Sequence, residues 1–382
     1  MFFIEKSKQT DVIFTYLSNF SGHKSTAESI SNAIKELDPN IVIKYIDSTY
    51  AYPTLSAVIS QFYLELIIKT PQIWDFVYNN PDVKKATKEI RELFNIMISP
   101  KLSKILNEYN PKVIVATHAL PANIIAYYKK QYKLNKPLIG VITDYGIHSY
   151  WFNNEIDLYM VATKEIYDEL VKNDIPTERI KITGIPVNPS FLNSIDKNFG
   201  KKYFGMNPRM FTIMIIGGSQ GLIPVIEIMK YLSNLHLPIQ YLIITGKNKN
   251  LFRELKRNYK DKKNLYIFGY IKNINIAMDA SDLIITKAGG ITITESITKK
   301  LPMIIVQPLP GQEKVNTKFL IKNKLAIVCE KISDLQDIIY NLYNNPKRLI
   351  IYRNRLSHFA KPYAAYECAE YVINFIKRCS NL

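Results

Sequence analysis

Residues 286–319, TKAGGITITESITKKLPMIIVQPLPGQEKVNTKF, hold the pattern that decides the fold of this chain. An apolar segment, Leu283–Thr286, leads into Gly289-Gly290, where a helix is expected to begin. A second apolar segment, Met303–Val306, leads into a Pro/Gly turn followed by amide and carboxylate side chains. Successive strands that end in glycine and polar residues are typical of an open α/β sheet, which binds ligands at the carboxyl ends of its strands. We therefore expect a ligand site at this edge.

The residue types at these strand ends indicate the chemistry of the ligand. A glycine pair lets the backbone approach a ligand closely, and the N–H groups at a helix start attract an anion such as a diphosphate. Glu295 lies one turn into the expected helix, and Gln312 with Glu313 follows the second strand. Such side chains exchange hydrogen bonds with sugar hydroxyls. The pattern favours a nucleotide diphosphate sugar.

Strand and helix patterns alternate along most of the chain, as in a parallel sheet with crossover helices. The alternation stops after Ile185 and resumes at Phe211. The sequence predicts an α/β protein with a Rossmann-like domain over residues 1–190, a linker over 191–208, and a second Rossmann-like domain over 209–382 that ends in a helical tail. The expected strands are Asp11–Leu17, Ile41–Ile46, Val113–Thr117, Leu138–Thr143, Leu158–Ala162, Phe211–Ile216, Tyr241–Thr245, Leu265–Phe268, Leu283–Thr286 and Met303–Val306.

A second glycine-rich turn, Gly217-Gly218-Ser219-Gln220-Gly221, directly follows the first strand of the second half. Such a turn can form a backbone nest for phosphate. Taken alone it is weak evidence, because many turns of this kind contain glycine only to reverse the chain. Its occurrence in the same half as Gly289-Gly290 favours the phosphate interpretation.

In the first half, His23 lies where the first strand meets the first helix. A helix start disfavours the imidazolium form, so the ring is expected to be neutral and able to act as a base. A lone histidine is more often structural. Asp144 and His148 follow another strand of this half and could reach the same edge; the alternative is that Asp144 caps a helix while nearby aromatic side chains pack.

The formal net charge of +17 would suit nucleic acid, an anionic membrane or an anionic small molecule. Much of it comes from lysines spread among Asn, Ile and Tyr, so compositional bias explains it equally well. No nucleic-acid-binding motif occurs, which makes nucleic acid the least favoured partner. The sequence has no apolar run of about 20 residues and no signal-peptide pattern. Cys329, Cys368 and Cys379 lack metal-ligand spacing and are expected to be free thiols of a reducing cytoplasm.

The region Leu55–Leu106 departs from the α/β pattern. Apolar and aromatic anchors beside lysines are typical of a helix lying in a membrane interface. A core helix with a solvated flank explains the periodicity as well. The anchors are Phe62, Tyr63, Leu66, Ile67, Ile68, Trp74, Phe76, Val77 and Tyr78, and the basic residues are Lys84, Lys85, Lys88, Arg91, Lys101 and Lys104.

The sequence contains no Asp-x-Asp pair, no His-Glu-x-x-His and no Walker A loop. Paired carboxylates are what a metal-dependent glycosyltransferase would need to hold its ion. Glycine turns, helix N-termini and Lys287 would instead neutralise a diphosphate leaving group. We therefore expect no metal.

Together the motifs resemble glycosyltransferase family 28, in particular its processive diacylglycerol glucosyltransferases and monogalactosyldiacylglycerol synthases. The resemblance implies a GT-B fold and inverting, metal-independent transfer of a hexose, with glucose favoured, from a UDP-sugar to diacylglycerol. It implies no cofactor besides this donor, and a peripheral enzyme on the anionic cytoplasmic face of the cell membrane. The residues that carry the resemblance are Gly22-His23-Lys24, Thr143-Asp144, His148, Trp151, Ile182–Val187, Thr286–Thr292, Pro310–Lys314 and Asn316.

The resemblance also assigns roles. His23 would lie near the acceptor hydroxyl as its base, with Asp144 as a second catalytic candidate. Two glycine turns would cradle the diphosphate, Glu295 would bind the ribose, Gln312 and Glu313 the sugar, and Gly269–Ile271 would frame the uracil. The donor residues are Gly217, Gly218, Ser219, Gln220, Gly269, Tyr270, Ile271, Lys287, Gly289, Gly290, Ile291, Thr292, Glu295, Gln312, Glu313 and Asn316.

Three other functions stay open. The acceptor could be another lipid, such as an undecaprenyl-linked peptidoglycan precursor, although Gln312-Glu313-Lys314 favours the glycerolipid branch. A UDP-sugar epimerase would share the fold. A nucleotide-sugar-sensing protein without turnover is the third, because the loop before His23 has fewer glycines than the family pattern. UDP-glucose and UDP-galactose are not distinguished.

Overall fold

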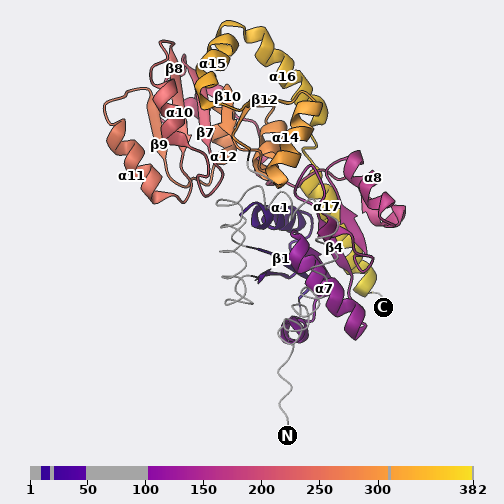
Figure 1. The fold of residues 1–382 in the computed structure, drawn as a ribbon. Helices are drawn as coiled ribbons and strands as arrows, with labels where there is room; N and C mark the ends of the chain where they lie inside the picture. Colours follow the sequence, from indigo (N-terminus) through magenta and orange to yellow (C-terminus); the bar gives the residue numbers. More distant parts are fainter. Residues whose placement is uncertain (1–9, 18–20, 49–101, 309–310, 381–382) are drawn as a thin grey trace. The chain divides into compact units, whose positions relative to one another are not determined.

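The computed structural model describes residues 10–17, 21–48, 102–308 and 311–380. The predicted membrane-interface residues between Phe62 and Lys101 lie outside these ranges. The chain divides into two compact units, each containing one sheet (Figure 1). The first unit comprises Met1–Pro189 together with Tyr363–Leu382, and the second comprises Ser190–Pro362.

The described part of the first unit contains a six-stranded parallel sheet with the order β2-β1-β3-β4-β5-β6. The five strands expected in this half are confirmed, with both ends of each within two residues of the predicted bounds, and β6 is an addition that the sequence did not predict. The strands are β1 (Val12–Tyr16), β2 (Ile43–Asp47), β3 (Val113–Ala116), β4 (Leu138–Val141), β5 (Leu158–Met160) and β6 (Ile180–Lys181).

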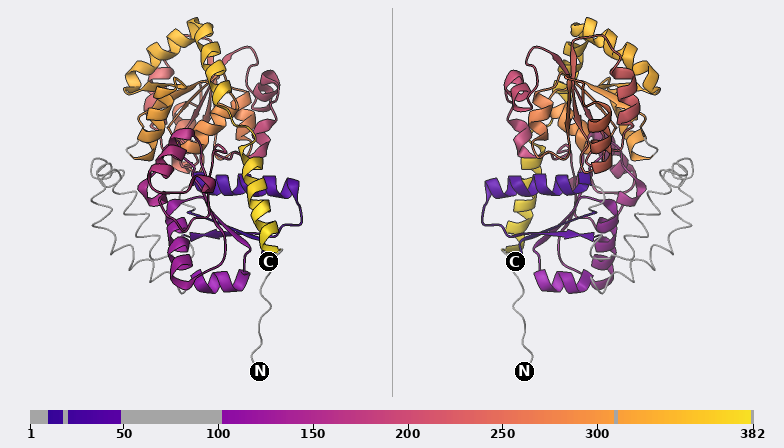
Figure 2. Two further views of the ribbon diagram at one scale, coloured as in Figure 1. Left: turned by 90° about the vertical axis from the view of Figure 1, so that its right-hand side faces the viewer. Right: turned by 90° about the vertical axis from the view of Figure 1, so that its left-hand side faces the viewer.

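Helices cover both faces of this sheet (Figure 2). Alternate residues of a strand point to opposite faces, and the central strands are buried at every position, so both faces pack against helices. Val12 and Phe14 share a buried cluster with residues of α1 (Ser21–Leu37) and α17 (Ala364–Ser380). Ile13 points to the other face, where it lines a small apolar cavity with Ile124 of α7 (Ala119–Tyr132). The elements that complete this unit are η1 (Ser149–Trp151), α8 (Lys164–Lys172) and η2 (Thr177–Arg179).

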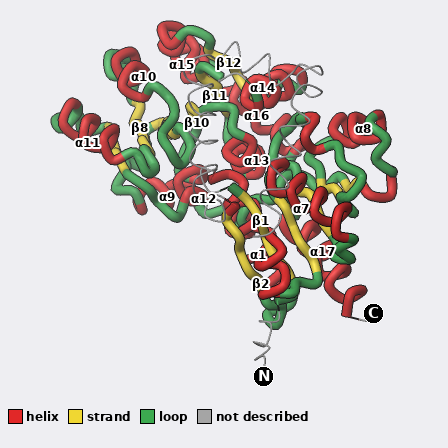
Figure 3. Tube along the Cα trace, turned by 60° about the horizontal axis from the view of Figure 1, so that its bottom comes forward, coloured by secondary structure: helices red, strands yellow, loops and turns green. Residues whose placement is uncertain are grey.

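The second unit contains a six-stranded parallel sheet with the order β12-β11-β10-β7-β8-β9, again enclosed by helices (Figure 3). Its five predicted strands are confirmed, and β12 was not predicted. The strands are β7 (Phe211–Ile216), β8 (Ile239–Ile244), β9 (Leu265–Phe268), β10 (Leu283–Thr286), β11 (Met303–Val306) and β12 (Ala326–Cys329). The helices are η3 (Pro189–Leu192), α9 (Lys197–Tyr203), α10 (Val225–Leu232), α11 (Lys249–Asn258), α12 (Ile274–Asp279), α13 (Gly290–Thr298), α14 (Gln312–Lys322), η4 (Ile332–Asp334), α15 (Leu335–Asn344) and α16 (Pro346–Phe359).

The division of the chain differs from the predicted one at two places. The last part of the expected helical tail, α17, packs with the first unit, where Cys368, Ala369 and Val372 join the core cluster of β1 and α1. The segment expected to be a linker contains α9 and belongs to the second unit. Periodicity identifies an apolar helix face but not the sheet that this face covers, which explains the difference.

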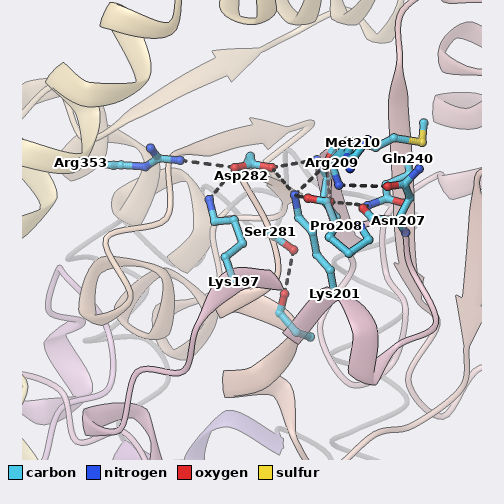
Figure 4. Close-up of polar contacts among 12 residues, drawn as sticks. Lys197, Lys201, Asn207, Pro208, Arg209, Met210, Gln240, Ser281, Asp282 and Arg353 are labelled. Carbon is cyan, nitrogen blue, oxygen red and sulfur yellow. Dashed lines mark hydrogen bonds and ion pairs between the residues drawn. The ribbon is translucent and has the colours of Figure 1, made fainter. Parts of the chain in front are cut away.

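Asp282, directly before β10, joins α9 to the second sheet (Figure 4). Its Oδ1 lies 2.5 Å from Nζ of Lys197, and its Oδ2 accepts hydrogen bonds from Nζ of Lys201 at 3.4 Å and from the Thr212 N–H at 2.9 Å. Arg353 of α16 lies 3.8 Å away. The Lys201 ammonium also donates to the carbonyl of Met210 at 2.7 Å. Burial acts to raise the pKa of Asp282, but the surrounding cations and the Thr212 N–H hold it below its usual range.

Replacing Asp282 by alanine is expected to lower the free energy of unfolding by about 1–3 kcal/mol, because Lys201 is buried and would lose its charged partner. The loss of unfolding free energy should stay below that for a fully buried pair, because solvent screens the half-exposed cations Lys197 and Arg353. Since the folded pKa of Asp282 is lowered, its contribution is present at neutral pH and is lost as pH falls below the usual carboxyl range.

Urea denaturation at pH 7 and at pH 3.5 measures this contribution. The matched control is Asp168→Ala, which removes an exposed ion pair with Lys164 and should change stability by at most about 0.5 kcal/mol. Equal stabilities for the two variants would show that the Asp282 network contributes nothing.

Candidate functional site

His23, the third residue of α1, is held at the carboxyl end of the first sheet. Its Nδ1 lies 2.7 Å from the Thr117 carbonyl oxygen, just past the end of β3, and 3.0 Å from Oγ1 of Thr143, which follows β4. The Thr117 hydroxyl donates to the carbonyl of His23 at 2.9 Å. A carbonyl oxygen only accepts, so Nδ1 carries the proton and the lone pair of the neutral ring is on Nε2. This is the tautomer that a base requires.

Burial lowers the pKa of His23 to about 4, with the hydrogen bond to Thr117 opposing the shift. The ring is therefore neutral at physiological pH, as the sequence predicted. The reason is different, however: desolvation dominates, whereas the sequence argument relied on the helix start.

Two further histidines lie in this part of the first unit. The ring of His118, the N-cap of α7, meets the ring of His23 edge to face, with centroids 4.6 Å apart. His148 is the N-cap of η1, and its ring lies 4.5 Å from that of Tyr150. His118 was not predicted as a site residue, although a Thr-His pair directly after a buried strand was a usable signal.

Asp144 lies half-buried in the bend after β4, next to Thr143 in sequence. The alternative that Asp144 caps the following helix is not what the structure shows, because His148 accepts the N–H of Tyr150 at the start of η1. Because β3 and β4 are parallel neighbours, the residues that follow them, Thr117, Thr143 and Asp144, lie at the same carboxyl edge of the sheet as His23.

In the second unit, the turn 217–221 packs against the residues that follow β8. Gly218 has φ +69° and Gly221 has φ +64°, which L side chains rarely adopt. A Cβ on Gly246 would come within 2.3 Å of the Ser219 carbonyl oxygen, which accepts the Lys247 N–H at 2.8 Å. This contact fixes the shape of the turn, and Gln220 is exposed at its tip.

Lys287, directly after β10, joins three of the predicted motifs. Its Cε would lie 3.4 Å from a Cβ on Gly218 and 3.9 Å from one on Gly289, so its stem runs beside both glycines. Its Nζ lies 2.5 Å from Oε1 of Glu313 in the first turn of α14. The structure therefore brings together the turn after β7, the start of α13 and the start of α14.

Gly289 is the N-cap of α13, and because glycine has no side chain, the first N–H groups of this helix donate no hydrogen bond to a cap side chain. Asn316 is buried and donates to the Ala288 carbonyl at 2.9 Å, which holds the turn before α13 against α14. Asn316 thus has a structural contact within the site. The first-turn residues Ile291 and Thr292 are half-buried. Gly290 itself is buried and begins the helix.

Glu295 lies half-buried on α13, and burial raises the pKa of its carboxyl to about 8. Gln312 is the first residue of α14 and is half-buried, whereas Glu313 is buried. The segment Gly269–Ile271 follows the edge strand β9, which β7 and β8 separate from β10, and Tyr270 is exposed. A Cβ on Gly269 would lie 3.8 Å from the Gly246 carbonyl oxygen. These side chains therefore border different parts of one sheet edge.

Among the described residues, no group of three or more His, Cys, Asp or Glu side chains could hold a metal ion. Over the same ranges no helix has the length and apolar character to cross a bilayer.

Two family models match consecutive parts of the chain. The first, monogalactosyldiacylglycerol (MGDG) synthase, matches residues 23–187, and the second, glycosyltransferase family 28 C-terminal domain, matches residues 212–364. A processive diacylglycerol beta-glucosyltransferase of Staphylococcus saprophyticus is 29% identical over 365 residues, which are 94% of this chain and 92% of that protein.

Solved structures show the same fold at low sequence identity. MurG of Acinetobacter baumannii superposes with a TM-score of 0.59 at 15% identity, covering 95% of this chain and 99% of that one. The HepE protein of Anabaena, solved in complex with UDP, gives a TM-score of 0.53 at 11% identity, covering 97% and 99%. The predicted fold class, an α/β GT-B fold with two Rossmann-like units, is thereby confirmed.

Proposed function

Since the chain belongs to glycosyltransferase family 28, we propose that it transfers a hexose, with glucose favoured, from a UDP-sugar to diacylglycerol. The observation that carries this proposal is the group Gly218, Lys287 and Glu313, in which two glycine turns, one cation and one carboxylate from three strand ends meet. The backbone N–H groups and the ammonium suit a diphosphate, and the carboxylate suits sugar hydroxyls. The name of the Staphylococcus relative supports diacylglycerol as the acceptor.

In the proposed reaction, Nε2 of His23 takes the proton of the acceptor hydroxyl. The hydroxyl oxygen attacks the anomeric carbon opposite the bond to UDP, so the configuration inverts. The bond between the anomeric carbon and the UDP oxygen breaks, and UDP leaves with the electron pair. The N–H groups at the start of α13 and the charge of Lys287 stabilise the departing diphosphate. No metal takes part, and Asp144 is the second candidate for the base.

We propose that the enzyme works as a peripheral protein on the anionic cytoplasmic face of the membrane and has no nucleic-acid partner. The formal net charge of +17 supports attraction to anionic lipid. Vesicle co-sedimentation at rising salt, with and without anionic lipid, tests the proposed membrane association separately from the transfer reaction. Equal binding to neutral and anionic vesicles would overturn it.

The experiment that tests the function uses the full chain, vesicles containing diacylglycerol, and UDP-glucose or UDP-galactose, with lipid products resolved by mass. We expect hexosyl-diacylglycerol and one free UDP for each sugar transferred, also in EDTA. An epimerase would change the sugar without lipid. A purely sensing protein would bind UDP-glucose and release nothing, and products only with a polyprenyl-linked acceptor would move the chain to that branch of transferases.

Glu295 is proposed to bind the ribose hydroxyls, and its raised pKa makes this testable by pH. Hydroxyls that donate to the carboxylate favour its charged form, so binding should release a proton from a group whose pKa is about 8 in the unliganded protein. Affinity for UDP-glucose, whose diphosphate ester has no proton to lose near neutral pH, should therefore rise with pH and level off above about 8.

Titration calorimetry at several pH values measures this effect. Glu295→Gln should remove the pH dependence, and Glu295→Ala should weaken binding by about 1–3 kcal/mol. An alanine variant with unchanged affinity would reject the ribose role.

A further inference from the structure

The three histidines of the first unit have tautomers that their hydrogen bonds determine. His23 carries its proton on Nδ1, because that atom faces the Thr117 carbonyl oxygen at 2.7 Å. His118 has the opposite tautomer, because its Nδ1 accepts the Leu120 N–H at 3.0 Å. His148 resembles His118, with Nδ1 accepting the Tyr150 N–H at 3.1 Å. The neutral rings of His118 and His148 therefore carry their protons on Nε2.

His118 makes two contacts of different kinds. Through Nδ1 it caps α7, a role that any good N-cap residue can take. Through its ring it packs edge to face against His23, at 4.6 Å between centroids and 87° between planes. An asparagine could replace the cap but not the ring, so the ring contact is the feature specific to histidine.

We propose that His118 is a positioning residue of the transfer reaction: its ring, anchored by the cap of α7, holds the imidazole of His23 in one orientation and shields it from water. This proposal rests on the proposed function for its kinetic consequence. His118 itself takes no proton from the acceptor, because its Nδ1 lone pair is engaged by the Leu120 N–H.

The charged and titratable groups around this pair support the assignment. Burial, with His23 and His148 as lesser causes, lowers the pKa of His118 well below its usual value. On α1, Lys24 pairs with Glu28 at 3.6 Å on an exposed side of the helix. From β3 and β4 come the uncharged Thr117 and Thr143, and Asp144 follows in the bend. Protons on both rings would place two positive charges side by side, and burial lowers the pKa of each ring, so both are neutral at physiological pH.

The test compares His118→Asn with His118→Ala in the full chain. Asparagine keeps the cap of α7 and removes the ring, whereas alanine removes both. NMR titration of selectively labelled histidine follows the protonation of His23 without substrate. The measured midpoint therefore does not depend on whether the acceptor is diacylglycerol. Turnover with UDP-glucose and diacylglycerol vesicles is measured from pH 4 to pH 8.

In the asparagine variant we expect the pH midpoint of His23 to rise from about 4 toward its ordinary 6.5, because water reaches the ring. Turnover at pH 8 should fall about 10²-fold through lost orientation, and the fall should deepen toward acidic pH. An asparagine variant with wild-type midpoint and pH profile would overturn the proposal and leave His118 as a helix cap. If the asparagine variant does not fold, His118→Ser replaces it, because serine is also a good N-cap residue. The pH midpoint of His23 and the pH profile of turnover then decide in the same way.

Discussion

The variant His23→Ala is expected to lower turnover by about 10²–10⁴-fold, while its affinity for UDP-glucose stays nearly unchanged. The two groups of residues belong to different units: the proposed base is held by Thr117 and Thr143 in the first unit, whereas the proposed donor residues lie in the second. Because the pKa of His23 is lowered to about 4, wild-type turnover should stay constant down to mildly acidic pH and fall only as His23 becomes protonated.

Steady-state kinetics and calorimetry on the same preparation check this expectation. The control is His358→Ala, which removes an exposed histidine from α16 and should change neither quantity. Near-normal turnover in His23→Ala would contradict the assignment and transfer the role of base to Asp144.

The variant Lys287→Met should lower kcat by about 10²–10³-fold, the range for losing one preorganised group that stabilises developing charge. Methionine keeps an unbranched stem beside Gly218 and Gly289 and removes only the ammonium. It also removes the ion pair, 2.5 Å long in the wild type, between Nζ of Lys287 and the buried carboxylate of Glu313. A loss of stability is therefore expected together with the loss of rate.

The double variant Lys287→Met, Glu313→Gln separates these two effects. It should recover most of the thermal stability, because the neutral amide loses less than a carboxylate when the ammonium of Lys287 is removed, yet it should stay slow if Lys287 stabilises the leaving diphosphate. Lys318→Met, an exposed lysine of α14, is the matched control. Recovery of full turnover in the double variant would show that Lys287 serves only to neutralise Glu313.

The local geometry around Lys287 follows more directly from the sequence than the contacts around His23 do, and the reason is physical. Around Lys287 the informative residues are glycines at strand ends, and their spacing reflects local backbone geometry that a sequence displays directly. The ion pair between Lys287 and Glu313 was not predicted, since it joins the ends of two different strands. In the first unit, the contact between His23 and His118 joins residues 95 positions apart in the chain, and no local pattern predicts such a contact.

The sequence by itself determined the α/β class, nearly all the strands and the glycine turns. These features depend on alternation, on apolar runs and on backbone conformations that few residues allow. The tertiary structure alone decided that α17 covers the first sheet, that α9 is tied to the second sheet through Asp282, and that His118 lies against His23. Each of these depends on which surfaces meet after the chain folds, and an apolar face or a polar side chain does not specify its partner.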